Sequence, residues 1–192
     1  MKRLVMKMKY EVRFSGTGGQ GIIRCAVLLA EAALYDGYFA AQSQVYGPES
    51  RGGSSQGEVV IKDTPIYYPK VTVPDVLLCL SQEAYNKYAG DIAEGGLLIC
   101  DSDFVQPDGR EGDTVQLCRL PMLETARDKL QNELSANVLA LGVLVGLTNV
   151  VSAAAVHRAL ANNFKAKILP LNLTAYQEGF QMAQNQAAAL NK

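Results

Sequence analysis

The stretch YEVRFSGTGGQGII, residues 10–23, decides the fold class. Its first half alternates apolar and polar side chains, which is typical of a β-strand. Its second half is a glycine-rich turn that leads into apolar residues at helical spacing from Ile22 to Leu34, and Gly37 marks the end of that helix. A strand, a glycine loop and a helix in this order form the opening of a βαβ unit, so we expect an α/β protein.

The chain continues to alternate between strand and helix patterns before it becomes helical. We expect strands at 38–44, 54–61, 75–81, 97–100 and 114–120, and a short helix at 82–89 that Ser81 caps. Two of these strands are apolar nearly throughout, as in sheets that helices cover on both faces. The predicted fold is therefore α/β and Rossmann-like, with a mostly parallel sheet flanked by helices and a helical C-terminal third.

Length and composition indicate one globular unit. The chain has 192 residues, of which 48% are hydrophobic, and this is enough for one full core. We expect residues 1–192 to form a single domain. Residues 1–9 are expected to be disordered, or to contain an alternative start of the chain at Met6 or Met8.

The charge balance and the apolar runs exclude several kinds of partner. A net charge of −1, from 18 basic and 19 acidic residues, leaves no basic stripe for nucleic acid. The longest apolar run, residues 138–147, is too short to cross a bilayer, and the N-terminus lacks the apolar stretch of a signal peptide. We expect a cytoplasmic protein that binds neither nucleic acid nor membrane.

One helix in the C-terminal third is unusual. Residues 136–147 are apolar nearly all the way round, and Gly142 and Gly146 stand four residues apart on them. Such a helix is buried on all sides. We expect it either in the core or packed closely against another chain.

The glycine motif is typical of a phosphate-binding loop but does not identify the ligand that carries the phosphate. Gly16, Gly18 and Gly21 satisfy G-x-G-x-x-G between a strand and a helix. NAD would require an acidic residue about 20 positions further on, and residues 38–44 contain none. The lysine and Ser/Thr of a P-loop are also missing. The loop is then either a cradle whose backbone N–H groups hold a phosphate or pyrophosphate, or only a tight turn.

No self-contained catalytic or metal site is recognisable. Asp101 and Asp103 follow a predicted strand and form either a magnesium site or, as we favour, a polar turn. His157 stands alone on a helix capped by Ser152, and we expect it to be a packed or solvated helix residue. We therefore predict no catalytic and no metal-binding residue in this chain, which indicates a subunit that completes another chain's site.

The cysteines support the same conclusion. They are widely spaced, so neither a zinc ribbon nor a locally bound iron–sulfur cluster is expected. Two of them lie in apolar strands and should be buried. The four are Cys25, Cys79, Cys100 and Cys118.

Four segments together carry a family resemblance. They are GTGGQGI at 16–22, YGPESRGG at 46–53, PDVLL at 74–78 and NLTAYQEGF at 172–180. In this order, from about residue 10 to residue 182, they resemble the gamma subunit of 2-oxoacid:ferredoxin oxidoreductases. The first two motifs as a pair are the specific part of the match.

The resemblance implies an assembly that oxidatively decarboxylates a 2-oxoacid to acyl-CoA and CO2 and reduces ferredoxin. It places thiamine diphosphate, magnesium and 4Fe–4S clusters on the alpha, beta or small ferredoxin-like subunits. The gamma subunit would bind no cofactor by itself, would be inactive alone, and would meet CoA at its interface. We favour 2-oxoglutarate as the substrate, with branched-chain 2-oxoacids and pyruvate as alternatives.

On this basis we expect the backbone N–H groups of residues 18–21 and the Arg51 guanidinium to hold CoA phosphates. An ion pair between Arg51 and Glu49 is the alternative for that arginine. Two competing hypotheses remain, a purely structural docking subunit and a stand-alone phosphate- or nucleotide-binding protein. The predicted cofactor-binding residues are Gly16, Gly18, Gly19, Gln20, Gly21 and Arg51, and the predicted subunit contacts are Tyr46, Gly47, Pro48 and Glu49.

Overall fold

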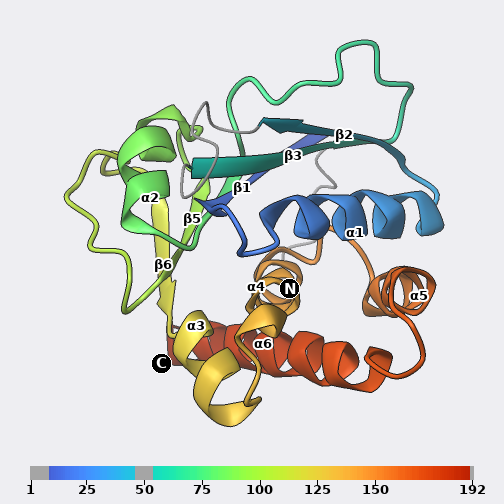
Figure 1. Ribbon diagram of the computed structural model, residues 1–192. Coiled ribbons are helices and arrows are strands. Elements are labelled where there is room, and N and C mark those ends of the chain that lie inside the picture. Colours follow the sequence, from blue (N-terminus) through green and yellow to red (C-terminus); the bar gives the residue numbers. More distant parts are fainter. Residues whose placement is uncertain (1–8, 46–53, 191–192) are drawn as a thin grey trace.

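The computed structural model describes residues 9–45 and 54–190, whose strands form one six-stranded sheet (Figure 1). The order across the sheet is β2-β3-β1-β4-β5-β6. β3 is antiparallel to both of its neighbours, and β1, β4, β5 and β6 are parallel. The strands are β1 (Lys9–Thr17), β2 (Phe39–Val45), β3 (Ser54–Lys62), β4 (Val76–Cys79), β5 (Leu97–Asp101) and β6 (Gln116–Leu120).

The helices of the described residues concentrate in the second half of the chain. None of them is both long and apolar enough to cross a membrane. The α-helices are α1 (Ile22–Tyr35), α2 (Gln82–Tyr88), α3 (Met122–Glu124), α4 (Ala136–Thr148), α5 (Ala153–Asn163) and α6 (Leu169–Leu190). Short 3-10 turns at Ala89–Asp91 and Glu133–Ser135 and a π-helical turn at Thr125–Lys129 join them.

The predicted α/β fold is confirmed, and so are the caps that Ser81 and Ser152 provide for α2 and α5. The opening unit differs from a simple βαβ arrangement in one respect. β2 does not lie beside β1, because β3 turns back from β2 and pairs with β1 from Lys9↔Lys62 to Thr17↔Ser54. The chain therefore crosses over through α1 to the edge of the sheet and then fills the gap with an antiparallel strand.

Helices cover both faces of the parallel strands. Ile99 and Leu78 belong to the large core shared with α1, α4, α5 and α6, whereas Leu77, Cys79 and Leu98 pack with Tyr85 on the α2 side. Successive side chains of a strand point to opposite faces, which explains this division. Figure 1 shows α1 and α4–α6 gathered below the sheet and α2 beside its other face.

The polar face of β1 is buried as well. Arg13, only 6% exposed, donates to Glu58 and Asp91 at 2.9 Å each, and its guanidinium stacks over the Tyr88 ring. Burial raises the pKa of Glu11, but hydrogen bonds from Lys9, Val73 and Thr72 outweigh it and hold that pKa below its ordinary value. The apolar side chains of β1 thus face one buried layer, and its polar side chains face a second, ionic layer that is also buried.

The all-round apolar helix lies in the core of this chain. Residues 136–145 of α4 are all buried, and the helix packs along α6. The two backbones touch at glycines: a Cβ at Gly142 would lie 2.9 Å from the Phe180 nitrogen, and one at Gly179 would overlap the Leu139 carbonyl. Of the two expected environments, burial in the core is the observed one.

This contact predicts the sign of a substitution. Gly→Ala within a helix usually stabilises by about 0.5–1 kcal/mol, but Gly179→Ala should lower the unfolding free energy by about 1–3 kcal/mol because its methyl group overlaps α4. Gly90→Ala is the matched control, since a Cβ there meets only the Arg110 carbonyl at 3.7 Å. Urea unfolding of both variants measures the difference. Equal stability of the two would contradict the packing described here.

Candidate functional site

The glycine loop joins the end of β1 to the start of α1. Gly16 still belongs to β1, opposite Ser55, and the turn itself comprises residues 18–21. Gly19 (φ +96°) and Gly21 (φ +74°) have left-handed backbone conformations, which glycine adopts without a steric penalty. Gly21 meets a second constraint, because a Cβ there would overlap the side-chain amide of Asn137 in α4.

The loop stands where the direction of the sheet's connections reverses. From β1 the chain passes through α1 to β2 on one side, whereas β4 pairs with β1 on the other side. Open α/β sheets bind ligands outside the carboxyl ends of their strands at such a switch point. Hydrogen bonds hold the ends of β1 and β4 together there, from the Leu80 nitrogen to the Ser15 carbonyl (3.0 Å) and from Gln20 Nε2 to the Leu80 carbonyl (3.3 Å).

Gln20 shapes the loop with both ends of its side chain. Its Oε1 accepts the Thr17 N–H at 2.8 Å while its Nε2 reaches Leu80, and its own N–H donates to the Thr17 carbonyl. Because these groups are already engaged, Gln20 supports the turn. Of the residues predicted to hold a phosphate, Gln20 is the one whose side chain makes hydrogen bonds within the described residues.

Several backbone donors of the loop remain available. Within residues 9–45 and 54–190, no acceptor receives the N–H groups of Gly18, Gly19, Gly21 or residues 22–24. α1 also has no side-chain N-cap and no acidic residue in its first turn. Unpaired N–H groups and the positive end of the helix dipole both favour an anion at this point.

The residues that flank the second motif lie at one end of the sheet. Tyr46, Gly47, Pro48, Glu49 and Arg51 lie outside the described residues. Their flanking strands are described: Val45 pairs with Gln56, and Ser54 pairs with Thr17, the last residue of β1. Glu83 and Lys87 of α2 anchor Ser54 through hydrogen bonds of 3.2 Å and 3.1 Å. The register therefore places Val45 and Ser54, the described residues on either side of segment 46–53, at the glycine-loop end of the sheet.

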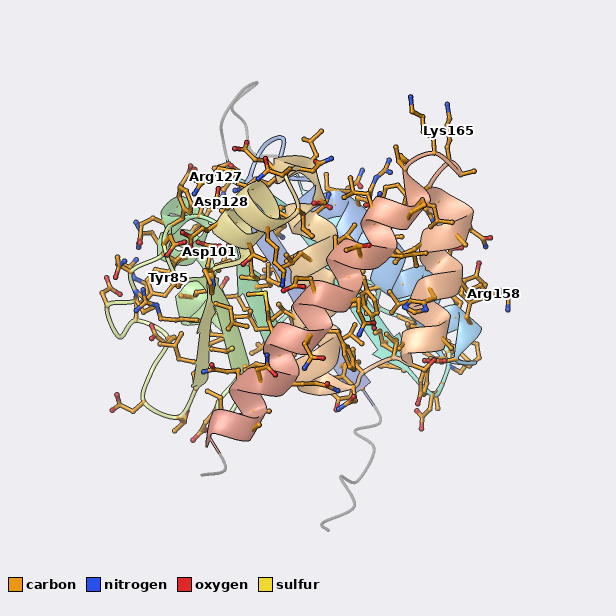
Figure 2. All side chains as sticks on the ribbon, turned by 90° about the horizontal axis from the view of Figure 1, so that it is seen from below. Tyr85, Asp101, Arg127, Asp128, Arg158 and Lys165 are labelled. Carbon is orange, nitrogen blue, oxygen red and sulfur yellow. The ribbon has the colours of Figure 1, made fainter. Side chains whose placement is uncertain are left out.

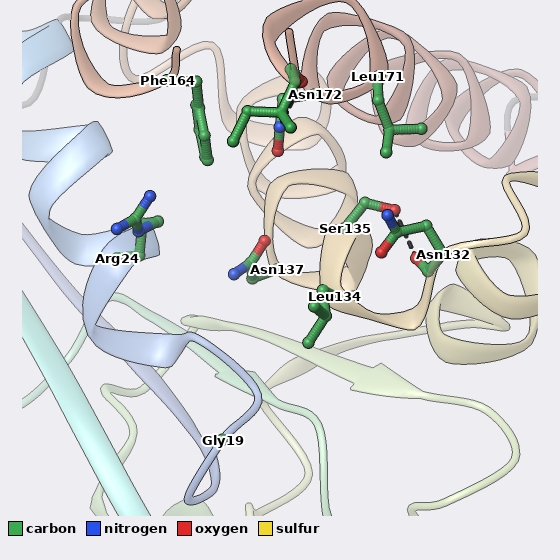
Figure 3. Close-up of a pocket in the computed structure, with 10 residues that line it drawn as sticks. Gly19, Arg24, Asn132, Leu134, Ser135, Asn137, Phe164, Leu171 and Asn172 are labelled. Atoms are coloured by element: carbon green, nitrogen blue, oxygen red, sulfur yellow. Dashed lines mark hydrogen bonds between the residues drawn. The ribbon is translucent and has the colours of Figure 1, made fainter.

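Two hollows flank the loop, and Gly19 borders both of them. The sheet-edge hollow, of about 390 Å³, lies over the ends of β1 and β4, between Thr17, Leu80, Phe104 and Arg127. The three-helix hollow, of about 320 Å³, lies between Arg24, Asn137, Phe164 and Asn172 (Figure 3). These walls could not be predicted from the glycine motif, because residues far along the chain, between 104 and 172, supply many of them. Asn137 was the one available signal, as the only polar side chain in the apolar run 136–147.

Asp101 organises a turn, as we favoured. It is fully buried; its Oδ1 accepts the N–H groups of Asp103 (3.1 Å) and Phe104 (3.2 Å), and its Oδ2 accepts that of Leu123 (2.8 Å). Figure 2 shows Asp101 on the same side of the molecule as Arg127. In the described part of the chain, no three His, Cys, Asp or Glu side chains gather as metal ligands do.

His157 and the cysteines occupy the environments that the sequence predicts. His157 is an exposed residue of α5 whose ring edge meets Tyr176, with 5.4 Å between the ring centroids. Cys25 lies beneath the loop and donates to the Asn137 carbonyl at 3.0 Å. Burial raises the pKa of the Cys25 thiol to about 12, so it stays protonated and is a poor nucleophile. All four cysteines are buried and unpaired, including the two predicted to be so.

The contact between Gly21 and Asn137 predicts that the effects of substitutions at these two residues on the unfolding free energy are coupled. Gly19→Ala should cost only the positive-φ penalty of about 1–2 kcal/mol, because a Cβ there meets open space. Gly21→Ala should cost about 1–3 kcal/mol more, and Asn137→Ala should recover part of that extra cost. Urea unfolding of the single and double variants measures the coupling. Strict additivity would show that the two residues do not touch.

Comparison with known proteins identifies the family of this chain. Residues 11–182 match the family described as pyruvate ferredoxin/flavodoxin oxidoreductase. The chain is 43% identical over 185 residues to the 2-oxoglutarate synthase subunit KorC of Methanocaldococcus jannaschii, covering 96% of this chain and 99% of that one. It also resembles the solved gamma subunit of a keto/oxoacid ferredoxin oxidoreductase from Geobacter sulfurreducens, with 43% identity, a TM-score of 0.82 and coverage of 92% and 97%.

A longer relative contains the same unit. The 2-oxoglutarate:ferredoxin oxidoreductase of Magnetococcus marinus, solved with 2-oxoglutarate, coenzyme A and succinyl-CoA bound, matches 93% of this chain with a TM-score of 0.85 and 27% identity. The match covers only 32% of that longer chain. The chain described here belongs to the pyruvate ferredoxin/flavodoxin oxidoreductase family, as a gamma subunit of a 2-oxoacid:ferredoxin oxidoreductase.

Proposed function

We propose that this chain is the gamma subunit of a 2-oxoglutarate:ferredoxin oxidoreductase, in which it supports assembly and presents its glycine loop to CoA. The M. jannaschii relative is a subunit of a 2-oxoglutarate synthase, and the M. marinus enzyme was solved with 2-oxoglutarate and CoA. Both support this substrate. Thiamine diphosphate, magnesium and the 4Fe–4S clusters would belong to alpha, beta and small ferredoxin-like partners, with ferredoxin as the electron acceptor.

The observation that supports the CoA role is the set of N–H groups at Gly18, Gly19, Gly21 and residues 22–24 that find no acceptor among the described residues, at the switch point of the sheet. Each hydrogen bond to a charged acceptor contributes about 1.5–3 kcal/mol, and a helix N-terminus adds about 0.3–1 kcal/mol. A few such local contacts suffice to hold a phosphate. The net charge of −1 would not attract one from a distance.

Arg51 and segment 46–53 complete the proposal. The flanking residues Val45 and Ser54 lie at the glycine-loop end of the sheet, which supports a role for this motif at the same site. We assign the Arg51 guanidinium to a CoA phosphate, and Tyr46, Gly47, Pro48 and Glu49 to the contact with the catalytic subunits. An ion pair between Arg51 and Glu49 is the alternative for this arginine.

A purely structural docking role is the second candidate. Gln20 favours it, because its side chain already satisfies Thr17 and Leu80 and so holds the loop in shape without a ligand. Under this alternative the loop and segment 46–53 would only contact partner subunits. Co-purification of the complex with and without CoA separates the two roles, since only the first makes the association depend on CoA.

The substrate assignment predicts a preference. The purified complex should reduce a viologen acceptor fastest with 2-oxoglutarate, and more slowly with pyruvate, 2-oxoisovalerate and indolepyruvate, at equal subsaturating concentrations. Comparing kcat/KM for the four 2-oxoacids measures this. A higher value for any of the other three would reassign the complex.

The assignment of Arg51 predicts a selective kinetic defect. In the reconstituted complex, Arg51→Ala should raise the KM for CoA by roughly tenfold, the loss of about 1.4 kcal/mol, and leave the KM for the 2-oxoacid unchanged. Arg158→Ala is the control, because Arg158 is an exposed residue of α5 on the opposite side of the molecule from Arg127 (Figure 2). Unchanged CoA kinetics with intact assembly would remove Arg51 from the site.

A further inference from the structure

The three-helix hollow has the chemistry of an anion site. The first turns of α1, α4 and α6 all contribute to its wall, through Arg24, Asn137 and Asn172 (Figure 3). These helices have 14, 13 and 22 residues, and none carries an acidic residue in its first turn. Each helix places the positive end of its dipole at the hollow, and the three add in the same sense.

The amide of Asn137 lines this hollow, and only its oxygen has a partner among the described residues. Asn137 is only 8% exposed, and its Oδ1 accepts the Val138 N–H at 2.6 Å, which fixes the orientation of the side chain. Among the described residues, its Nδ2 donates to no acceptor and stands beside Gly21. This nitrogen is not sealed from solvent, since the Tyr176 hydroxyl is the buried side-chain polar atom without a partner among the described residues. A ligand in the hollow would therefore be able to reach Asn137 Nδ2 and accept a hydrogen bond from it.

The other polar groups complement Asn137. The Arg24 guanidinium stacks on the Phe164 ring, 5.1 Å from its centroid, and is the only charged side chain among the described residues that line the hollow. Asn172 is 7% exposed and donates through Nδ2 to the Ile168 carbonyl at 2.8 Å. No described donor reaches its Oδ1, which is therefore left to accept an amino or hydroxyl group.

The sheet-edge hollow offers less to an anion. Its arginine, Arg127, is already paired with Asp128 at 2.6 Å, and Glu133 adds a negative charge to its lining. A phosphate group would therefore favour the three-helix hollow over the sheet-edge hollow. The two meet at Gly19, so one elongated ligand would be able to pass from one hollow to the other.

We propose that the three-helix hollow binds a nucleoside phosphate, with the phosphate at Arg24 and Asn137 and the base against Phe164. Pockets for whole drug-sized ligands have volumes of about 300–1,000 Å³. The 320 Å³ here accommodates one end of a molecule as large as CoA. The nucleoside phosphate is either the nucleotide end of CoA, in which case this proposal rests on the proposed function, or a free nucleotide with the same chemistry.

Calorimetric titration of the full chain with adenosine 3′,5′-bisphosphate, the nucleotide end of CoA, tests this. Pantetheine, AMP and inorganic phosphate serve as comparison ligands. Asn137→Asp, which replaces the N–H donor by a carboxylate of the same shape, and Arg24→Gln should each weaken binding of the bisphosphate at least tenfold. Arg158→Gln is the matched control, because that arginine also stacks on an aromatic ring, 4.1 Å from the Tyr35 centroid, but Tyr35 ends α1 whereas Arg24 lies in its first turn.

The outcomes separate this proposal from the CoA role of the loop. Bisphosphate affinity that neither variant changes, or no binding by the chain or the complex at millimolar concentration, overturns the proposal. Arg24 is exposed, so Arg24→Gln carries the test if Asn137→Asp unfolds.

If the KM for CoA depends on Arg51 but not on Arg24, the CoA role of the loop stands and the three-helix hollow is not the CoA site. If the bisphosphate or AMP needs Arg24 while CoA kinetics depend on neither arginine, the hollow binds a free nucleotide and the CoA role falls.

Discussion

The close approach of α4 and α6 is the constraint on which the rest of the structure depends. Their backbones touch at Gly142 and Gly179, so neither helix can shift without a clash or a void. This contact fixes the first turn of each helix relative to α1. Asn137 consequently reaches Gly21, and Asn172 faces the same hollow. The environment of the glycine loop is therefore set by packing that occurs more than a hundred residues further along the chain.

A second constraint acts on the other side of the sheet. β1 lies between an apolar core and the buried ion pair of Arg13 with Glu58, so both of its faces are fixed. Breaking a buried pair of this kind by removing one partner costs about 3–5 kcal/mol, because the remaining charge is left without compensation. This rigid strand ends at the glycine loop. A loop supported in this way holds its N–H groups in place before any ligand arrives, which reduces the entropy lost on binding.

Family membership follows from matches that cover nearly the whole chain. Anion binding is our proposal, and it is supported by backbone N–H groups without an acceptor among the described residues, by three helix N-termini and by the Asn137 amide nitrogen. CoA has the chemistry that this proposal requires, because it combines phosphates with an aromatic base. Under the proposed function, a gamma subunit that positions CoA would complete a reaction whose redox centres the partner subunits would hold.

The sequence by itself determined the local elements and the family. Period-2 and period-3.6 patterns depend on which side of one element is buried, so the strands, α1, the buried helix α4 and the caps at Ser81 and Ser152 could be predicted. The glycine motif was recognisable because positive φ values leave few alternatives to glycine. Only the tertiary structure decided that β3 lies between β1 and β2, that the polar face of β1 is buried, and that Arg24, Asn137 and Asn172 surround one hollow. These features depend on contacts between residues far apart in the chain, and no local periodicity records such contacts.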